Sequence, residues 1–261
     1  MRQRIRWPAS PRTLIVAAAA VSIGIAAWNS PALAYRPFDG TDAAVAKDGE
    51  MEVELQPAGP IWERSQTTLI APATRLNFGM PKDWELVIEG QGEWPLSPSG
   101  PARLADPAVF LKHVLHPGSL QDKSGWSVAT EFGVLLPDST DAGVGASLAG
   151  VASQRWDWGA VHFNAATAIT RDHHADVFLS TILEGPSKWT VRPVAEVFYE
   201  QEFGVLHTIS GLVGAIWQVK DDLSFDVGFR HALTNGHTVN EIRAGLTFGF
   251  PLKMGNGAKN K

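Results

Sequence analysis

The C-terminal stretch, residues 222–250, alternates strictly between apolar and polar side chains in two runs that a short turn, Asn235-Gly236-His237, separates. The apolar positions of the two runs are Leu223, Phe225, Val227, Phe229, Ile242, Ala244, Leu246, Phe248 and Phe250. Alternation of this kind predicts β-strands with one apolar and one polar face, and the turn between them predicts a hairpin.

The length of these runs limits the fold further. Strands of soluble proteins have about 5 to 6 residues, whereas alternating strands of roughly 9 to 11 residues that end in an aromatic side chain are typical of transmembrane β-barrels. We therefore predict an all-β fold, a transmembrane antiparallel up-and-down barrel whose apolar face meets lipid. The alternative is a secreted β-sandwich, in which the same apolar face packs inward.

The first 34 residues have the features of an export signal. Four arginines, an apolar run at residues 14–27 and the sequence Ala32-Leu33-Ala34 follow one another. The apolar run is shorter than the ~20 residues of a spanning helix, so the pattern predicts a signal peptide cleaved after Ala34. We expect export to the cell outer membrane of a Gram-negative bacterium.

The composition excludes several classes of protein. Residues 1–34 hold four arginines and no acidic residue, so the remainder, with 18 basic and 27 acidic residues, has a net charge of −9. This acidity argues against binding to nucleic acid. The chain has no cysteine and hence no disulfide, so its stability must come from packing or from closing a sheet.

Alternation and turn residues predict about twelve strands within a barrel at residues 50–250. The expected strands are residues 50–63, 67–80, 83–94, 108–115, 125–136, 146–155, 157–170, 174–184, 188–201, 206–219 and the two of the C-terminal hairpin. An even number places both ends of the barrel on the periplasmic side. We expect a periplasmic lead-in at residues 35–49, a long proline-rich outer loop at residues 95–107 and a polar tail at residues 251–261.

Aromatic residues fall at the periplasmic ends of these strands. In the expected register the lipid-facing positions there are Trp84, Trp126, Trp189, Trp217 and Phe250. Tryptophan is enriched at membrane interfaces because its ring is partly apolar and partly polar. We interpret these residues as membrane-interface aromatics, the alternative being tryptophans in the core of a sandwich.

Four segments resemble the outer-membrane family associated with the meta-pathway of phenol degradation. They are RPFDGTDAAVAKDGEMEVEL, TLIAPATRLNFG followed by DWELVIEG, QRWDWGAVHFNAA and EIRAGLTFGF. The resemblance spans nearly all of residues 35–250 and implies a barrel that admits hydrophobic or aromatic compounds. We expect a monomer whose partners are outer-membrane lipid and the barrel-assembly machinery. The tail after Phe250 departs from such barrels, which commonly end at that aromatic residue.

Charged side chains on the polar face of the strands are the candidate solute path. They are Glu85, Glu89, Glu93, Lys112, Glu131, Arg192, Glu196, Asp226, Arg230, Glu241 and Arg243, with Arg75 and Glu200 on the same face. Charges are costly in lipid and tolerated in a wet or mutually paired lumen. They predict either a pore lining that favours cations or an ion-pair network that plugs a narrow barrel.

Two groups of histidines are candidate chemical sites, and neither has the arrangement that its chemistry requires. His231 lies on the lipid-facing side with Thr234 nearby, yet no serine is adjacent and no G-x-S-x-G motif occurs, as a lipid hydrolase would require. His173 and His174 are consecutive and would point to opposite faces of a strand, so one metal ion cannot bind both there.

We expect no enzyme activity, cofactor or metal. The predicted function is a passive channel or uptake protein for small hydrophobic or aromatic solutes. A non-conducting structural or binding barrel is the alternative, and a lipid hydrolase is the more distant one.

Overall fold

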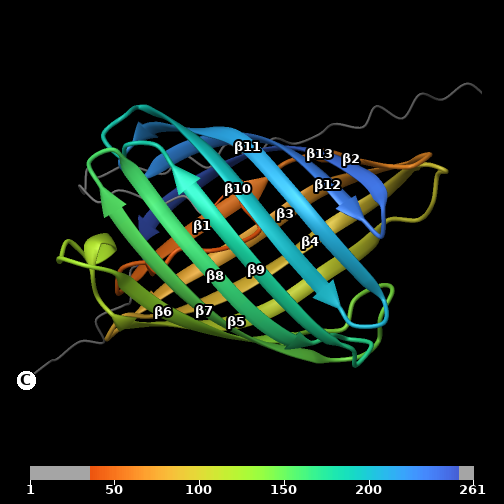
Figure 1. Cartoon of the computed structure of the whole chain (residues 1–261), viewed down its shortest axis with the longest axis horizontal. Coiled ribbons are helices and arrows are strands. Elements are labelled where there is room, and N and C mark those ends of the chain that lie inside the picture. Colours follow the sequence, from red (N-terminus) through yellow and green to blue (C-terminus); the bar gives the residue numbers. More distant parts are fainter. Residues whose placement is uncertain (1–35, 253–261) are drawn as a thin grey trace, which may run out of the picture.

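The computed structural model describes residues 36–252, which form a closed antiparallel β-barrel (Figure 1). Its strands are β1 (Glu50–Gln56), β2 (Gly59–Glu63), β3 (Gln66–Met80), β4 (Trp84–Ser97), β5 (Arg103–His116), β6 (Ser127–Leu135), β7 (Gly145–Trp156), β8 (Gly159–Ile169), β9 (Ala175–Glu184), β10 (Val191–Glu202), β11 (Leu206–Lys220), β12 (Leu223–Thr234) and β13 (His237–Pro251). A single 3-10 turn, η1 (Ser119–Gln121), joins β5 to β6.

The thirteen segments make twelve wall strands. Each strand pairs with its neighbours in sequence, and both β1 and β2 pair with β3 on one side and β13 on the other. β1 and β2 are therefore two halves of one strand that Pro57 and Ala58 interrupt. The predicted all-β barrel and its twelve strands are confirmed, and the first wall strand has the predicted bounds, Glu50 to Glu63.

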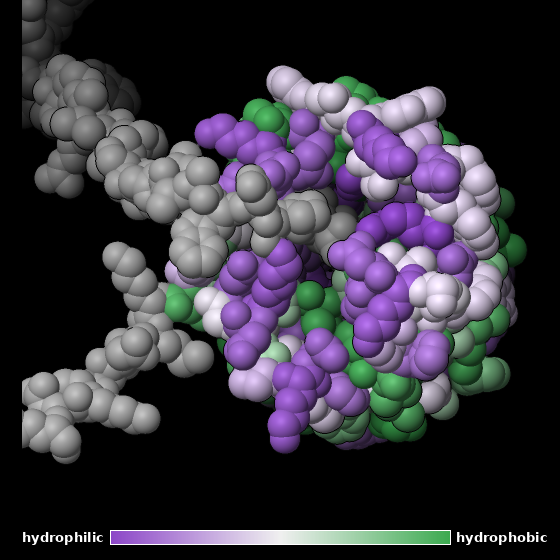
Figure 2. Space-filling model, turned by 90° about the vertical axis from the view of Figure 1, so that its left-hand side faces the viewer, coloured by the Kyte–Doolittle hydropathy of each residue, from purple (hydrophilic) through white to green (hydrophobic). Residues whose placement is uncertain are grey.

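The wall is apolar outside and polar inside, the reverse of a soluble sandwich. In β12 the outward Phe225, Val227 and Phe229 are 41%, 52% and 45% exposed, while the alternating Ser224 and Asp226 are 0% and 5% exposed. An exposed apolar band around a closed barrel is typical of a surface that meets lipid. Viewed from one end, hydrophilic residues surround the rim and hydrophobic residues follow the outer edge (Figure 2).

The barrel has two distinct ends. Glu50 and Pro251 lie at the terminal end, on the left in Figure 1, together with η1. The joins 64–65, 98–102, 136–144, 170–174, 203–205 and 235–236 lie at the opposite end, here called the loop end. The five predicted interface aromatics lie near the terminal end of the barrel, at or beside the ends of their strands. Their contact with a membrane interface stays a prediction.

The expected long proline-rich loop is wrong. β4 continues to Ser97 and β5 begins at Arg103, so residues 98–102 alone make the join. Pro95 and Pro107 lie within strands beside register shifts of the ladder, where a missing backbone N–H is tolerated.

No helix in residues 36–252 is long and apolar enough to cross a membrane. The predicted signal peptide and all but the first two residues of the polar tail lie outside the described part of the chain.

Candidate functional site

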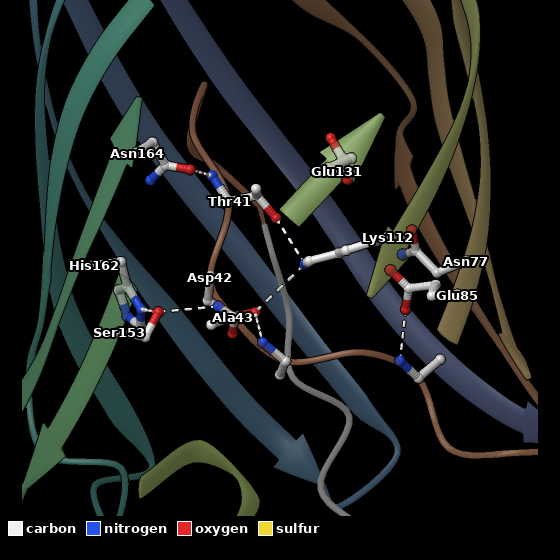
Figure 3. Close-up of polar contacts among 12 residues, drawn as sticks. Thr41, Asp42, Ala43, Asn77, Glu85, Lys112, Glu131, Ser153, His162 and Asn164 are labelled. Carbon is white, nitrogen blue, oxygen red and sulfur yellow. Dashed lines mark hydrogen bonds and ion pairs between the residues drawn. The ribbon is translucent and has the colours of Figure 1, made fainter. Parts of the chain in front are cut away.

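Residues 36–49, here called the inner segment, lie against the inside of the barrel wall. They contact β12 and β13 first and then β10, β8 and β7 in turn. Thr41 also contacts β5 across the lumen, and Ala46 contacts β4. Figure 3 shows the segment between Asn164 and Ser153 on one wall and Lys112 and Glu85 on the other. This position corrects the expectation of an extended periplasmic lead-in.

Side chains of the wall bind the backbone of the inner segment. The N–H groups of Asp39 and Gly40 donate to the two carboxylate oxygens of Glu196 at 2.7 and 2.8 Å. The N–H of Thr41 donates to Asn164 Oδ1 at 2.9 Å. A backbone inside a barrel has no ladder partner, and a buried N–H without a partner is costly; the inward polar residues supply the missing acceptors.

Apolar contacts also fix the inner segment. Phe38 packs against Val194 and Ile216 of the wall. Ala43 and Ala44 pack in a second cluster with Leu120 of η1, Ala129 and Val151. The join that contains η1 therefore contacts the inner segment at the terminal end of the barrel.

Gly40 lies close against the wall. A Cβ at this position would lie 2.4 Å from Ser180 Oγ, 2.9 Å from Asn164 Nδ2 and 3.0 Å from Glu196 Oε1. The close approach to these wall side chains, rather than the backbone angles, favours glycine here.

Arg243 ties the start of the inner segment to β13. Its guanidinium donates to the carbonyl of Pro37 at 2.7 Å, to Asp39 at 2.8 Å and to Glu241 at 3.0 Å. Arg230 Nε donates to the same Glu241 carboxylate at 2.8 Å. One buried carboxylate thus binds two arginines, and one of these binds the inner segment.

A second ion-pair network lies on strands β3 to β6. Arg75 Nη1 is 2.7 Å from Glu89, and its Nη2 is 3.2 Å from Glu131. Lys112 Nζ donates to Thr41 Oγ1 at 3.0 Å and lies 3.8 Å from Asp42 of the inner segment. These charges are paired with one another or with the inner segment.

Arg171 links neighbouring elements at the loop end. Its Nε donates to the carbonyl of Leu136 at 2.6 Å, and its Nη1 lies 3.3 Å from Asp106.

Asp138 stabilises the nearby loop. Burial by itself raises the pKa of this carboxyl, but hydrogen bonds from the N–H groups of Asp141 and Thr140 hold the pKa below its usual value.

Three cavities adjoin one another along the lumen beside the inner segment. The loop-end cavity, about 290 Å³, is lined by residues that include Glu89, Asp106 and Glu200. These three residues also line the central cavity, about 550 Å³. Glu54 and Arg75 line both the central cavity and the terminal cavity, about 400 Å³. Shared walls make the three a series from one end of the barrel to the other.

The junction between the loop-end and central cavities is acidic. Glu89 is bound by Arg75 and Asp106 by Arg171. Glu200, in contrast, has no hydrogen bond or ion pair among the described residues. It is a partly exposed carboxylate that makes no direct contact with a basic side chain.

All eleven predicted solute-path residues lie on the inward side of the wall. Seven are buried, namely Glu85, Lys112, Glu131, Arg192, Glu196, Asp226 and Glu241, and the other four are partly buried. They do not form one site, because Glu93 lies beyond the three cavities and Glu196 binds the inner segment instead. Their role toward a solute stays a prediction.

Several lining residues were missed from the sequence. Glu52 and Glu54 line the terminal cavity, and the alternation Glu-Met-Glu-Val-Glu-Leu was a sufficient signal for their inward direction. Asp39 belongs to the inner segment and Asp106 to the stretch expected to be a loop, so no periodic signal pointed to either.

The histidines weighed for chemistry have ordinary partners. His231 Nδ1 lies 2.8 Å from Asn240 Oδ1 on the exposed side of the wall. His174 lies 3.6 Å from Glu202. Within residues 36–252 no group of three or more histidine or acidic side chains is placed to hold a metal ion.

No protein-family model and no curated protein sequence matches the chain. Solved structures are similar to it in fold. The COG4313 outer membrane channel from Pseudomonas putida F1 superposes with a TM-score of 0.60 at 8% identity, covering 82% of this chain and 100% of the channel. The KdgM porin in complex with disordered oligogalacturonate has a TM-score of 0.53 at 9% identity, covering 76% and 99%. The NanC porin has a TM-score of 0.53 at 8% identity, covering 76% and 98%. At such identities the likeness concerns the fold.

Proposed function

We propose that this protein is a narrow outer-membrane channel for small solutes that favours cations. The observation that supports it best is the series of three adjoining cavities beside the inner segment. A barrel with a solid core would serve as a structural element only, whereas a series of cavities offers a route for water and small solutes.

The charge of the cavity walls supports the preference for cations. The loop-end cavity has five acidic lining residues and one basic residue, Arg171. The terminal cavity has nine acidic and five basic lining residues. Rings of carboxylates raise the local concentration of cations and lower the barrier to their passage.

Hydrophobic or aromatic solutes, the class implied by the family resemblance, are a second candidate. One observation favours them: the rings of Phe178 and Phe198 lie in the central cavity with centroids 5.2 Å apart. Oligogalacturonate, the ligand of one KdgM porin structure, is a polyanion, and the acidic excess in this lumen does not favour it.

The same proposal includes the cellular location and the oligomeric state of the protein. A barrel with an apolar outer band and a predicted signal peptide fits export to the outer membrane. Twelve fully paired wall strands need no second chain to close the sheet, which supports a monomer.

Single-channel recording in planar bilayers tests the proposal. With a KCl gradient across the membrane, we expect small steps of current and a reversal potential of the sign given by potassium permeation. A reversal potential of the opposite sign would contradict the cation preference. Silent membranes, with correctly folded protein inserted, would favour the non-conducting barrel. Swelling of proteoliposomes in phenol and in small polar solutes compares the two solute classes.

A further inference from the structure

One corner of the central cavity combines aromatic rings with the unpaired carboxylate. Phe178 of β9 is the direct cross-strand partner of Glu200 of β10. Phe198 lies two residues before Glu200 on the same inward face, and its ring is tilted by 41° to that of Phe178. The two rings and the carboxylate all line the central cavity.

The neighbouring charges leave Glu200 as the group available to a ligand. Arg230 lines the same cavity, but its Nε donates to Glu241 at 2.8 Å. Glu202, on the same face of β10, lies 3.6 Å from His174. The other two acidic residues of the junction are bound by arginines. A cation that reaches the junction therefore finds one carboxylate that no basic side chain contacts directly.

The chemistry of this corner selects one kind of cation. Aromatic faces attract a cation through the negative potential of the ring, and a carboxylate attracts it through charge. A small metal ion would lose its hydration against the phenyl rings without gaining oxygen ligands from them. A neutral aromatic solute would contact the rings but leave the carboxylate without a counter-charge. An ammonium ion with apolar substituents satisfies both groups.

We propose that Phe178, Phe198 and Glu200 form a binding site for a small organic ammonium ion at the junction of the loop-end and central cavities. This inference rests on the proposed function, because the site lies on the route that cations would follow. A cavity of about 550 Å³ accommodates an ion of the size of choline.

Binding to the purified full-length protein in detergent tests the site directly. Isothermal titration is carried out with choline and with 3,3-dimethyl-1-butanol, which has the same shape without the charge. We expect choline to bind and the neutral alcohol to bind at least about tenfold more weakly. Glu200→Gln should reduce choline affinity about tenfold or more, and Phe178→Leu should reduce it by a smaller factor.

Glu63→Gln is the matched control. It removes one partly buried carboxylate at the loop end, but Glu63 lines none of the three cavities, so choline affinity should not change. Equal binding of choline and the neutral alcohol would overturn the proposal in favour of an apolar pocket. Undetectable choline binding by folded wild-type protein, or equal loss in the Glu63 variant, would also overturn it.

Current recordings separate this inference from the channel itself. Choline added to the loop-end side should reduce the potassium current of the wild type and leave that of Glu200→Gln unchanged. A cation-selective current insensitive to choline would overturn the ammonium site and leave the channel standing. Choline binding by a protein that conducts no current would overturn the channel and leave the site standing.

Discussion

The residue that links the barrel wall to the inner segment most directly is Arg243. It donates to Pro37, Asp39 and Glu241 from one guanidinium. Removing one partner of a buried ion pair typically costs about 3–5 kcal/mol, because the other charge is left uncompensated. Arg243→Gln should therefore destabilise the folded barrel by about this amount and loosen the inner segment. The measurement is the urea concentration at which the compact, unboiled form disappears from a gel.

A surface ion pair provides the control for this variant. Lys188 lies 3.3 Å from Asp157, and both side chains are more than four-fifths exposed. Exposed pairs contribute about 0–1 kcal/mol, so Lys188→Gln should leave the unfolding midpoint almost unchanged. A similar shift in both variants would contradict the role assigned to Arg243.

Gly40 gives a steric test of the same segment. Gly40→Ala places a methyl group 2.4 Å from Ser180 Oγ, and either the segment or the wall side chains that hold it must shift to relieve the contact. We expect faster cleavage of the inner segment by added protease and a larger single-channel current. Gly211→Ala is the matched control, since a Cβ there meets no atom within 4 Å. Identical behaviour of the two variants would show that the segment does not sit tightly against Ser180.

At the scale of elements, the wall strands were predictable and the inner segment was not. Alternation is a local signal: Ser224 and Asp226 point inward because their neighbours Phe225 and Val227 are apolar. The inner segment has no periodicity, and its partners are distant, up to 206 residues away for Pro37 and Arg243. No pattern within residues 36–49 indicates such a contact. The position of the inner segment in the lumen is therefore visible only in the folded barrel.

The proline-rich stretch was misjudged for a related reason. Proline is rare in central strands, which favoured a loop over residues 95–107. The structure places a left-handed residue, Asp106, at φ 52° immediately before Pro107, beside the register shift between β4 and β5. Sequence patterns do not reveal which prolines fall at such irregularities, because the register depends on the neighbouring strand.

Deleting residues 36–46 tests the inner segment as an element. The wall strands begin at Glu50 and make all their ladder pairs without the segment, so the barrel should still close. Conductance should rise several-fold, because the segment occupies part of the lumen and pore current grows with open cross-section. Unchanged conductance in a folded deletion variant would mean that the wall side chains alone set the constriction.

A disulfide cross-link would fix the inner segment to the wall instead of removing it. The chain has no native cysteine, so Gly40→Cys with Ser180→Cys introduces a single pair; the close approach of these positions suits a disulfide after a small shift. The oxidised protein should show a low, steady current, and reductant should increase it if the segment moves during conduction. The same response to reductant in the cysteine-free chain would show that the increase has another origin.

At the scale of the whole molecule, closure of the sheet replaces the core of a soluble protein. The ladder from β3 to β13 is completed by β1 and β2, so no long strand edge stays unpaired. The number of strands and the inward or outward direction of their side chains were predictable, because lipid and lumen impose the same two-residue alternation on every strand. The series of cavities was not, since its width depends on the inner segment and on pairs such as Arg75 with Glu89.

Val53 tests this closure where the first wall strand pairs with the last. It lies in the middle of β1, opposite Phe248 of β13 and Leu76 of β3. Proline at this position removes a backbone donor from the ladder that joins the first wall strand to the last, and central strands do not tolerate that loss. A closed barrel migrates compactly until it is boiled. Val53→Pro should abolish this compact band in isolated outer membranes, whereas Val53→Thr, which keeps the N–H and the branched shape, should preserve it. A compact band that survives the proline would mean that the β1–β13 seam does not hold the barrel closed, and that pairing of β2 with β13 is sufficient.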